Sequence, residues 1–310
     1  MQGTRRPVKS REFIGDLLLS GSWTEARERV GEWLERWLFT PASGISLSPA
    51  CAELVRYSLL PPGKALRPSL YLVCLSGLGV PMESGRNGAL ALECVHTYSL
   101  IHDDLPCMDD DDLRRGRPSA HVRFSEAEAV LSGDALLTLS FELLGNEAPE
   151  VAGAMVKALA IAAGGGGMVD GQLLDMAATG CTGSESACQA IHERKTAALI
   201  GAAMSMAAIR ARRPPEEVLE MKSMGEDLGL IFQLVDDILD VDALAGELGK
   251  TTGKDAAQGK LTYPAAVGME KSKEILEKLV ASALARCERL PLENSGEIRS
   301  LIHFLHQRRH

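Results

Sequence analysis

Apolar residues recur at helical spacing along most of the chain, beginning near residue 22. Trp23, Trp33 and Trp37 belong to the first such segment, and Ser22 with Glu25 three positions later forms the pattern of a capping box. Tryptophans at helical spacing are typical of a core or a subunit contact. We therefore predict a helix that begins after Ser22 and buries these rings.

The same periodicity, with helix start signals, predicts a succession of further helices. Period-2 alternation of β-branched residues is almost absent, which favours an all-α protein. We expect one large helical bundle in a single domain, residues 22–310, preceded by a polar and flexible arm, residues 1–21. The helices expected are one starting at Ser48-Pro49, one after Pro214-Pro215, and those of residues 70–78, 88–102, 125–144, 150–163, 164–178, 184–210, 272–288 and 295–307.

Composition narrows the class of protein. Of the 310 residues, 45% are apolar and only 4% are aromatic, so the core must be aliphatic. The net charge of −9 argues against nucleic acid as the main partner. No uninterrupted apolar run reaches the ~18 residues of a membrane span, and no leader pattern opens the chain. Seven cysteines without CxxC pairs indicate reduced thiols, hence a cytoplasmic protein.

An acidic stretch, residues 100–118, contains the first candidate site. Asp103, Asp104 and Asp109 stand in it beside Arg114 and Arg115. Dense carboxylates repel one another unless a cation lies among them, and Mg²⁺ prefers such oxygen ligands. Arginines close to the carboxylates suit a diphosphate bridged by the metal. A solvated acidic turn is the competing interpretation of this stretch alone.

A second acidic cluster lies inside an apolar run, residues 231–241. Asp236 and Asp240 are four residues apart and therefore share a helix face, with Asp237 beside them. Carboxylates in apolar surroundings are costly unless they coordinate something. Together the two clusters predict a pair of metal-binding carboxylate groups with the metals between them.

Several cationic or polar positions have a functional and an ordinary interpretation. Lys64 and Arg67 occupy a proline-rich turn before a helix, and His96 lies two turns before Asp103. Lys195 is a phosphate ligand if it faces inward and an ordinary surface residue if it faces outward. The loop after the second cluster contains Lys250, Lys254 and Lys260 among glycines and is predicted to close over phosphate as a lid. The glycines at 164–167 predict a bend or a close backbone approach.

These motifs resemble those of the trans-isoprenyl diphosphate synthases, and most closely the bacterial short-chain farnesyl group. The resemblance covers roughly residues 25–309. It depends on motifs that stand in the family's order: GKALRP, ECVHTYSLIHDDLPCMDDDDLRRGRPSAHVRF, GDALLTL, GMVDGQLLD, HERKTAALI, FQLVDDILDV, ELGKTTGKD and GKLTYP. It implies a helical bundle around a central cavity, commonly a homodimer.

By this resemblance, three Mg²⁺ ions per active site bridge an allylic diphosphate. Asp103, Asp109 and Asp236 would hold them, with Asp104, Asp237 and Asp240 completing the two aspartate motifs. The remaining roles are similar to the family's: Arg114, Lys195, Lys250 and Lys260 for the allylic diphosphate, Lys64, Arg67, His96 and Arg115 for isopentenyl diphosphate, and Thr196 and Gln233 facing the reacting carbons.

The resemblance also implies the reaction and its product. Isopentenyl diphosphate would condense head to tail with dimethylallyl or geranyl diphosphate through an allylic carbocation, to give mainly farnesyl diphosphate. Tyr98, with Ser99, occupies the place where a bulky aromatic marks the farnesyl-forming members. Tyr98 as an ordinary core residue is the alternative.

Other functions stay open from the sequence. A geranylgeranyl or geranyl diphosphate synthase of the same family is the first. A terpene cyclase shares the first aspartate motif, but its second would mix Asn, Ser or Thr and Glu, unlike Asp236, Asp237 and Asp240. A non-catalytic prenyltransferase subunit and an acidic cation-binding scaffold are further alternatives.

Overall fold

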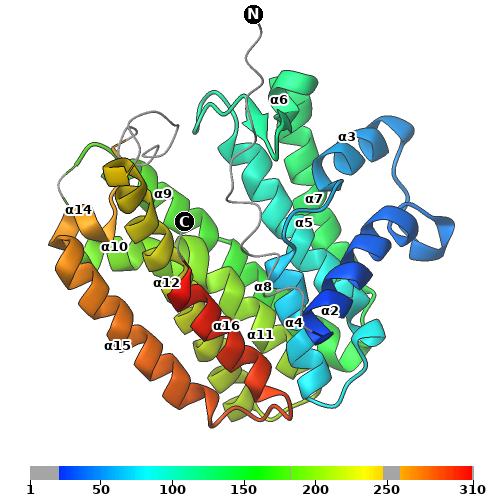
Figure 1. The fold of residues 1–310 in the computed structure, drawn as a ribbon. Coiled ribbons are helices and arrows are strands. Elements are labelled where there is room, and N and C mark those ends of the chain that lie inside the picture. The colour runs from blue at the N-terminus through cyan, green and yellow to red at the C-terminus, as the bar shows by residue number, and fades with distance from the viewer. Residues whose placement is uncertain (1–20, 182, 247–258, 309–310) are drawn as a thin grey trace, which may run out of the picture. The chain divides into compact units, whose positions relative to one another are not determined.

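The computed structural model describes residues 21–181, 183–246 and 259–308, and these are almost entirely helical (Figure 1). They group into two compact units, each described by itself below. The N-terminal unit comprises 24–160 and 202–218. The C-terminal unit comprises 161–201 and 219–310, with the residues up to Trp23. The predicted arm, apart from Gly21, and the predicted lid with Lys250 and Lys254 lie outside the described residues. The single domain over 22–310 stays a prediction.

The N-terminal unit is built around helices α5 and α7, which pack against each other. The helix α2 begins at the boundary of the units, and α8 continues beyond it. The elements in chain order are α2 (Gly21–Glu32), a π-helical turn (Trp33–Trp37), a 3-10 turn (Pro41–Ser43), α3 (Pro49–Leu59), α4 (Leu66–Gly77), a 3-10 turn (Met82–Gly85), α5 (Arg86–Asp103), β1 (Leu113–Arg114), β2 (Arg117–Pro118), α6 (Ala120–Arg123), α7 (Glu126–Gly145) and α8 (Pro149–Ala163).

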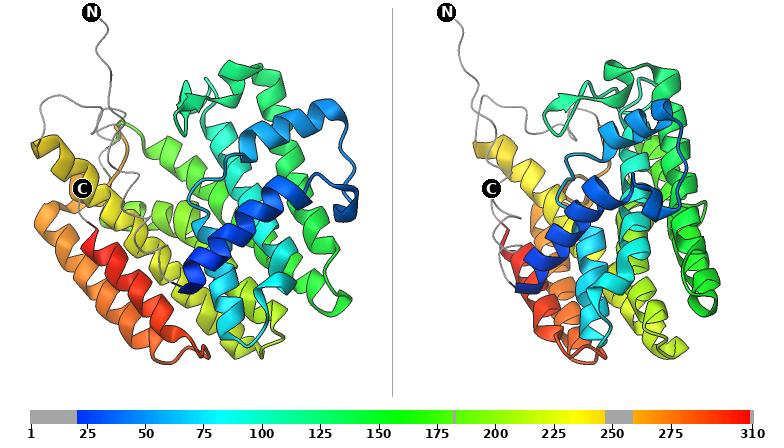
Figure 2. Two further views of the ribbon diagram at one scale, coloured as in Figure 1. Left: turned by 45° about the vertical axis from the view of Figure 1, so that its right-hand side comes forward. Right: turned by 90° about the vertical axis from the view of Figure 1, so that its right-hand side faces the viewer.

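The C-terminal unit is helical throughout its described residues. Its helices α15 and α16 lie side by side, orange and red in both views of Figure 2. The elements are α9 (Met168–Ala178), α10 (Glu185–His192), the π-helical turn η5 (Glu193–Ala197), α11 (Ala198–Arg210), α12 (Pro215–Gly246), α14 (Tyr263–Val267), α15 (Met269–Cys287) and α16 (Ser295–Gln307). The end of α11 and the start of α12 belong to the N-terminal unit.

Side-chain caps fix several helix starts, as the sequence predicted. The hydroxyl of Ser48 accepts from the backbone N–H of Cys51, with Pro49 in the first turn. Ser125 caps α7 in the same way through Glu128. The cap predicted at Ser22 is wrong, because Ser22 lies inside α2 and its hydroxyl donates instead to Glu297.

The core is aliphatic, as the scarcity of aromatic residues required. The described α4 and α5 are buried over most of their length, with leucine, valine, alanine and cysteine predominating. Trp23 and Trp33 are buried, which confirms the predicted core role for both rings. Trp37 is half-buried and lies 4.7 Å from the guanidinium carbon of Arg86. The described residues are almost entirely helical, so the all-α prediction is confirmed.

Two predicted helices are interrupted. The helix expected over 164–178 begins only at Met168, because the glycines before it form a turn. A Cβ on Gly167 would lie 2.1 Å from the carbonyl oxygen of Ala162, so this turn requires glycine there. The helix expected over 184–210 is divided by η5 into α10 and α11. The first interruption confirms the predicted bend, and the second was not predicted.

One stretch of the described chain, Pro149–Ala178, is long and apolar enough to cross a membrane by length and composition, with a mean hydropathy of 1.4. It consists of α8 and α9 separated by the glycine turn. Core helices of soluble proteins pass the same test, so this stretch is weak support for a membrane span.

Candidate active site

The first acidic cluster begins where α5 ends. Asp103 is the last residue of the helix, and its carbonyl accepts from the N–H of Asp109 at 2.8 Å. The carbonyl of Asp104 accepts from Asp111 at 3.2 Å. These backbone bonds fold the loop back on itself and bring Asp109 next to the helix end. The backbones of Asp103 and Asp109 are thereby in contact although the residues are six positions apart, and both side chains are half-buried.

Asp104 points the other way, into the protein. Its side chain is only 2% exposed, and both carboxylate oxygens accept from the guanidinium of Arg114, whose Nε lies 3.0 and 3.1 Å from them. Burial raises the pKa of Asp104, and Arg114 partly offsets this. Arg114, predicted for the allylic diphosphate, thus has an internal partner in the structure.

A two-residue hairpin presents the arginines that follow. Strands β1 and β2 pair antiparallel and are joined by Arg115 and Gly116, both at positive φ, as tight hairpin turns require. Arg117 fixes the hairpin to α3, because its Nη2 donates to the carbonyl of Tyr57 at 2.6 Å and its guanidinium stacks on that ring. The turn therefore holds Arg115 in a defined place.

Three of the four residues predicted for isopentenyl diphosphate lie together in this unit. Burial and the charges of Arg67 and Arg115 lower the pKa of His96, which keeps the imidazole neutral near pH 7. Burial lowers the pKa of Arg67 itself to about 10. Lys64 is exposed in the adjacent turn, where a Cβ on Gly63 would lie 3.0 Å from Nη2 of Arg115. A cluster of cations with a neutral imidazole suits an anion of high charge.

Glu93 belongs to the same cluster, and sequence reasoning missed it. Its side chain is 1% exposed and lies 3.7 Å from Nη2 of Arg115, and neither of its buried oxygens has a hydrogen-bond partner. Burial raises its pKa, which Arg115 and Arg67 oppose. A glutamate within an otherwise apolar helical run, three residues before His96, was the available signal.

A pocket lies between the hairpin, α3 and α5. Asp104, Arg114, Arg115 and Arg117 line one part of it, and Thr97 lines another. The hydroxyl of Thr97 is buried without a hydrogen-bond partner. The pocket thus combines polar groups and charges of both signs beside the first cluster.

Tyr98, the predicted chain-length residue, is 5% exposed. Its ring meets that of His102 edge to face, with centroids 5.7 Å apart. Burial raises its pKa to about 12, so the phenol stays protonated. Ser99 is half-buried and donates to the carbonyl of His96. Tyr98 is therefore firmly packed, and its influence on product length stays a prediction.

The second acidic cluster lies on α12 in the C-terminal unit. Asp236 and Asp240 are half-buried on one helix face, whereas Asp237 turns inward and is 2% exposed. Oδ2 of Asp237 accepts from the backbone N–H of Tyr263 at 2.9 Å, and Oδ1 accepts from the amide of Gln233 at 3.2 Å. Asp237 thus fixes the chain at the start of α14 to the middle of α12.

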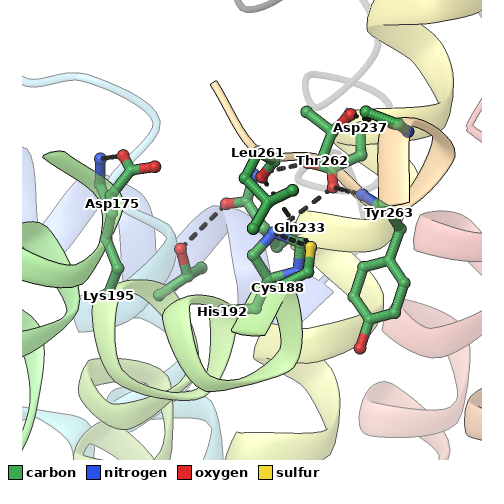
Figure 3. A network of polar contacts seen from close by, with 11 residues as sticks. Asp175, Cys188, His192, Lys195, Gln233, Asp237, Leu261, Thr262 and Tyr263 are labelled. Atoms are coloured by element: carbon green, nitrogen blue, oxygen red, sulfur yellow. Dashed lines mark hydrogen bonds and ion pairs between the residues drawn. The ribbon is translucent and has the colours of Figure 1, made fainter. Parts of the chain in front are cut away.

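His192 and Cys188 of α10 complete this network (Figure 3). Nε2 of His192 lies 3.4 Å from Oδ2 of Asp237 and 3.7 Å from Sγ of Cys188. Burial lowers the pKa of His192 to about 4, and burial raises that of the Cys188 thiol. All seven cysteines are free thiols, as expected for reduced residues. Cys188 and His192 are therefore neutral near pH 7.

Lys195 faces a carboxylate rather than open solvent. Its Nζ lies 2.6 Å from Oδ2 of Asp175 on α9, and the lysine side chain is 26% exposed (Figure 3). The next residue, Thr196, is buried and donates to Oε1 of Gln233 at 2.9 Å. The predicted pair Thr196 and Gln233 is thus in direct contact. Asp175, at the end of the GQLLD motif, had no predicted role.

Glycines let η5 come close to its neighbours. A Cβ on Gly171 of α9 would lie 2.2 Å from the backbone nitrogen of Lys195. A Cβ on Gly229 of α12 would lie 2.4 Å from Cα of Ala197. Real Cβ atoms never approach so closely, so these positions tolerate only glycine. The close packing fixes Lys195 and Thr196 with respect to α9 and α12.

The donor chemistry of both clusters fits Mg²⁺. The predicted ligands Asp103, Asp109 and Asp236 offer hard carboxylate oxygens and are half-buried, while the inward Asp104 and Asp237 are taken up by internal bonds. Lys260 is described and half-buried, while Lys250 lies outside the described residues. The individual roles of all these residues stay predictions.

Comparison with solved structures defines the class of protein. The chain superposes on an FPP/GFPP synthase from Zymomonas mobilis with a TM-score of 0.78 and 34% identity, covering 94% of this chain and 99% of that one. A geranyltransferase from Helicobacter pylori, complexed with magnesium and isoprenyl diphosphate, gives a TM-score of 0.75 at 31% identity, with 97% and 98% covered. The fold is therefore the all-helical fold of the isoprenoid synthases.

Sequence comparison then defines the family. Residues 48–291 match the profile of the Polyprenyl synthetase family, and the chain belongs to that family. It is 47% identical to geranylgeranyl pyrophosphate synthase 11 of Arabidopsis thaliana, over 73% of this chain and 66% of the relative. It is 40% identical to the farnesyl diphosphate synthase of Bacillus subtilis, over 81% and 86%. The match thus spans about two thirds of the plant relative. Relatives named for either product match, so the family alone leaves product length open.

Proposed function

We propose that the protein is a Mg²⁺-dependent prenyltransferase that condenses isopentenyl diphosphate head to tail with an allylic diphosphate, dimethylallyl or geranyl. The observation that supports this best is the common design of the two acidic clusters. In each, one aspartate turns inward to a partner inside the protein, Asp104 to Arg114 and Asp237 to the N–H of Tyr263, and the neighbouring aspartates proposed for the metal are half-buried. Cytoplasmic location, a homodimer and three Mg²⁺ per active site are part of the proposal.

The chain's residues perform separate tasks in this reaction. Asp103 and Asp109 in the N-terminal unit and Asp236 in the C-terminal unit would hold Mg²⁺, which would supply positive charge to neutralise the departing diphosphate. The cations near the first cluster, Arg67 and Arg115 among them, bind the second diphosphate and orient it. Much of the rate is expected from this positioning. A largely aliphatic core would shield a carbocation from water.

Thr196 and Gln233 are proposed to face the reacting carbons. Their mutual hydrogen bond fixes both side chains, and Gln233 is held further by Asp237. Lys195 is proposed to bind the allylic diphosphate. Because its ammonium pairs with Asp175, its direction is set before substrate arrives.

The experiment is turnover of labelled isopentenyl diphosphate with geranyl diphosphate and Mg²⁺, followed by chromatography of the dephosphorylated alcohols. Farnesol or a longer prenyl alcohol supports the proposal. A cyclic hydrocarbon would indicate a terpene cyclase. Absence of any product from folded protein at saturating Mg²⁺ would favour a non-catalytic subunit.

For product length we propose farnesyl diphosphate as the main product, with geranylgeranyl or geranyl diphosphate as the alternative. The support is the bulk of Tyr98, which is buried one and a half turns before Asp103. Tyr98→Ala is expected to lengthen the product, while Tyr98→Phe keeps the bulk and the product. An active Tyr98→Ala enzyme with an unchanged product would place the determinant elsewhere.

A further inference from the structure

Helix α16 brings Arg308, one residue beyond its end, against the second acidic cluster. The helix buries Ile298, Leu301 and Leu305 on one face. Near its end, Nε2 of His306 lies 2.8 Å from Oε1 of Glu277 on α15. Arg308 thus follows directly on a helix that is packed along one face and hydrogen-bonded to α15 near its end.

Arg308 makes two contacts with one face of α12. Its Nη1 donates to Oδ1 of Asp236, and its guanidinium carbon lies 5.6 Å from the centroid of the Phe232 ring. Phe232 and Asp236 are four residues apart, so both contacts lie on the same face. The side chains of Arg308 and Asp236 are 16% and 33% exposed. Partial burial reduces the solvent screening that makes exposed ion pairs weak.

Asp236 thus has two candidate cations. It is the residue of this cluster that the proposed function assigns to Mg²⁺, and it is already paired with a guanidinium. A metal ion and a guanidinium that share one carboxylate repel each other. Binding of one therefore weakens binding of the other.

We propose that Arg308 is a built-in counter-ion of the second metal site, which pairs with Asp236 in the metal-free protein and is displaced when a divalent cation binds. The inference rests on the proposed function for the identity of the metal. Its physical effect is to stabilise the metal-free cluster, where carboxylates would otherwise repel, and to weaken binding of the metal alone. A partly buried ion pair of this kind is expected to weaken binding ~3–10-fold.

The experiment measures binding of Mn²⁺ alone, as a paramagnetic stand-in for Mg²⁺, from the signal of free Mn²⁺ in electron paramagnetic resonance. Arg308→Gln is expected to bind Mn²⁺ ~3–10-fold more tightly than the unaltered protein. Arg308→Lys retains the charge and is expected to bind as the unaltered protein does. Arg299→Gln is the matched control, since Arg299 lies on the same helix and pairs only loosely, at 3.5 Å, with the exposed Glu288.

A second arm tests whether the effect acts through Asp236. In an Asp236→Asn background, Arg308→Gln is expected to change Mn²⁺ binding no further. Equal affinity in Arg308→Gln and the unaltered protein, or an equal gain in Arg299→Gln, would overturn the proposal. So would a gain that persists without Asp236.

The assay is independent of turnover. If the protein fails to elongate any prenyl diphosphate while Arg308→Gln still tightens Mn²⁺ binding, the proposed function fails and the counter-ion stands. If elongation is observed and Arg308→Gln does not change the affinity for Mn²⁺, the proposed function stands and the counter-ion proposal fails.

Discussion

The two acidic clusters contain similar residues but lie on different secondary structure. The first lies in a loop that is folded by backbone hydrogen bonds at the end of α5. The second lies within the regular helix α12. Each nevertheless turns the second residue of an Asp-Asp pair, Asp104 or Asp237, into the protein. Adjacent aspartates thus take different positions: one turns inward to an internal partner, and the other stays half-buried, where the proposed function places a metal.

The two clusters also differ in the hydrogen-bond partners of the inward aspartate. Asp104 accepts from a side chain, Arg114, which is itself 35% exposed. Asp237 accepts from a buried backbone N–H, that of Tyr263, and from a side-chain amide. If Asp104 is lost, the guanidinium of Arg114 can turn to water. If Asp237 is lost, the buried N–H of Tyr263 cannot.

The largest expected effect tests the outward aspartates. Asp103→Ala or Asp236→Ala is expected to lower kcat by at least ~10²-fold, because each removes stabilisation of developing charge. The free energy of unfolding without metal should be unchanged or higher in Asp103→Ala, since a repelling carboxylate is lost, and slightly lower in Asp236→Ala, which loses its ion pair with Arg308. Steady-state kinetics in saturating Mg²⁺ and urea unfolding measure the two quantities. Near-normal turnover in either variant would remove that residue from the metal site.

The inward aspartates should show the opposite pattern, with stability affected and by unequal amounts. Asp237→Ala is expected to lower the free energy of unfolding by roughly 2–4 kcal/mol, because the N–H of Tyr263 and the amide of Gln233 lose their acceptor. Asp104→Ala should cost roughly 1–2 kcal/mol, since Arg114 reaches solvent. Urea unfolding compares the two. An equal or greater loss in Asp104→Ala would contradict the distinction drawn here.

Lower pH should weaken the support of the second cluster through His192. Burial holds its pKa at about 4 in the folded protein, against about 6.5 when unfolded. Between these values the unfolded chain binds more protons, so stability falls as the pH falls. From about pH 7 to pH 5 the loss is roughly 2 kcal/mol. Unfolding at both pH values should show that His192→Gln loses correspondingly less. A variant with the same pH dependence as the unaltered protein would contradict the assignment.

The smallest expected effect tests directly whether the first cluster lies in a loop and the second in a helix. Asp110 in the first cluster has a φ of 51°, so Asp110→Gly should leave stability unchanged or raise it by up to about 1 kcal/mol. Asp240→Gly, within the last two turns of α12, should instead lower it by about 1 kcal/mol. If the first cluster lies in a loop and the second in a helix, thermal unfolding should show Asp110→Gly as stable as the unaltered protein or more so, and Asp240→Gly less stable. Destabilisation of both by the same amount would remove the contrast.

Helix periodicity and capping residues predicted most helices, the spacing of the aspartates indicated both acidic clusters, and the family resemblance assigned Thr196 and Gln233 to one site, where the structure shows them hydrogen-bonded to each other. They could not predict which aspartate turns inward, because Asp104 and Asp237 find their partners 10 and 26 residues away. The same reason hides Glu93 and Arg308, whose contacts come from packing rather than from neighbours in sequence.

The π-helical turn η5 has a consequence for how this site can be altered. A π turn is equivalent to one residue inserted into an α-helix. Because the wide turn takes up this extra residue, deleting Arg194 would return the segment to α-helical spacing with α10 and α11 on their present faces, and would redirect the side chains within the turn. Lys195 and Thr196 could then not both keep their partners, Asp175 on α9 and Gln233 on α12. A single codon removed here would disconnect the site while leaving every functional side chain in the chain.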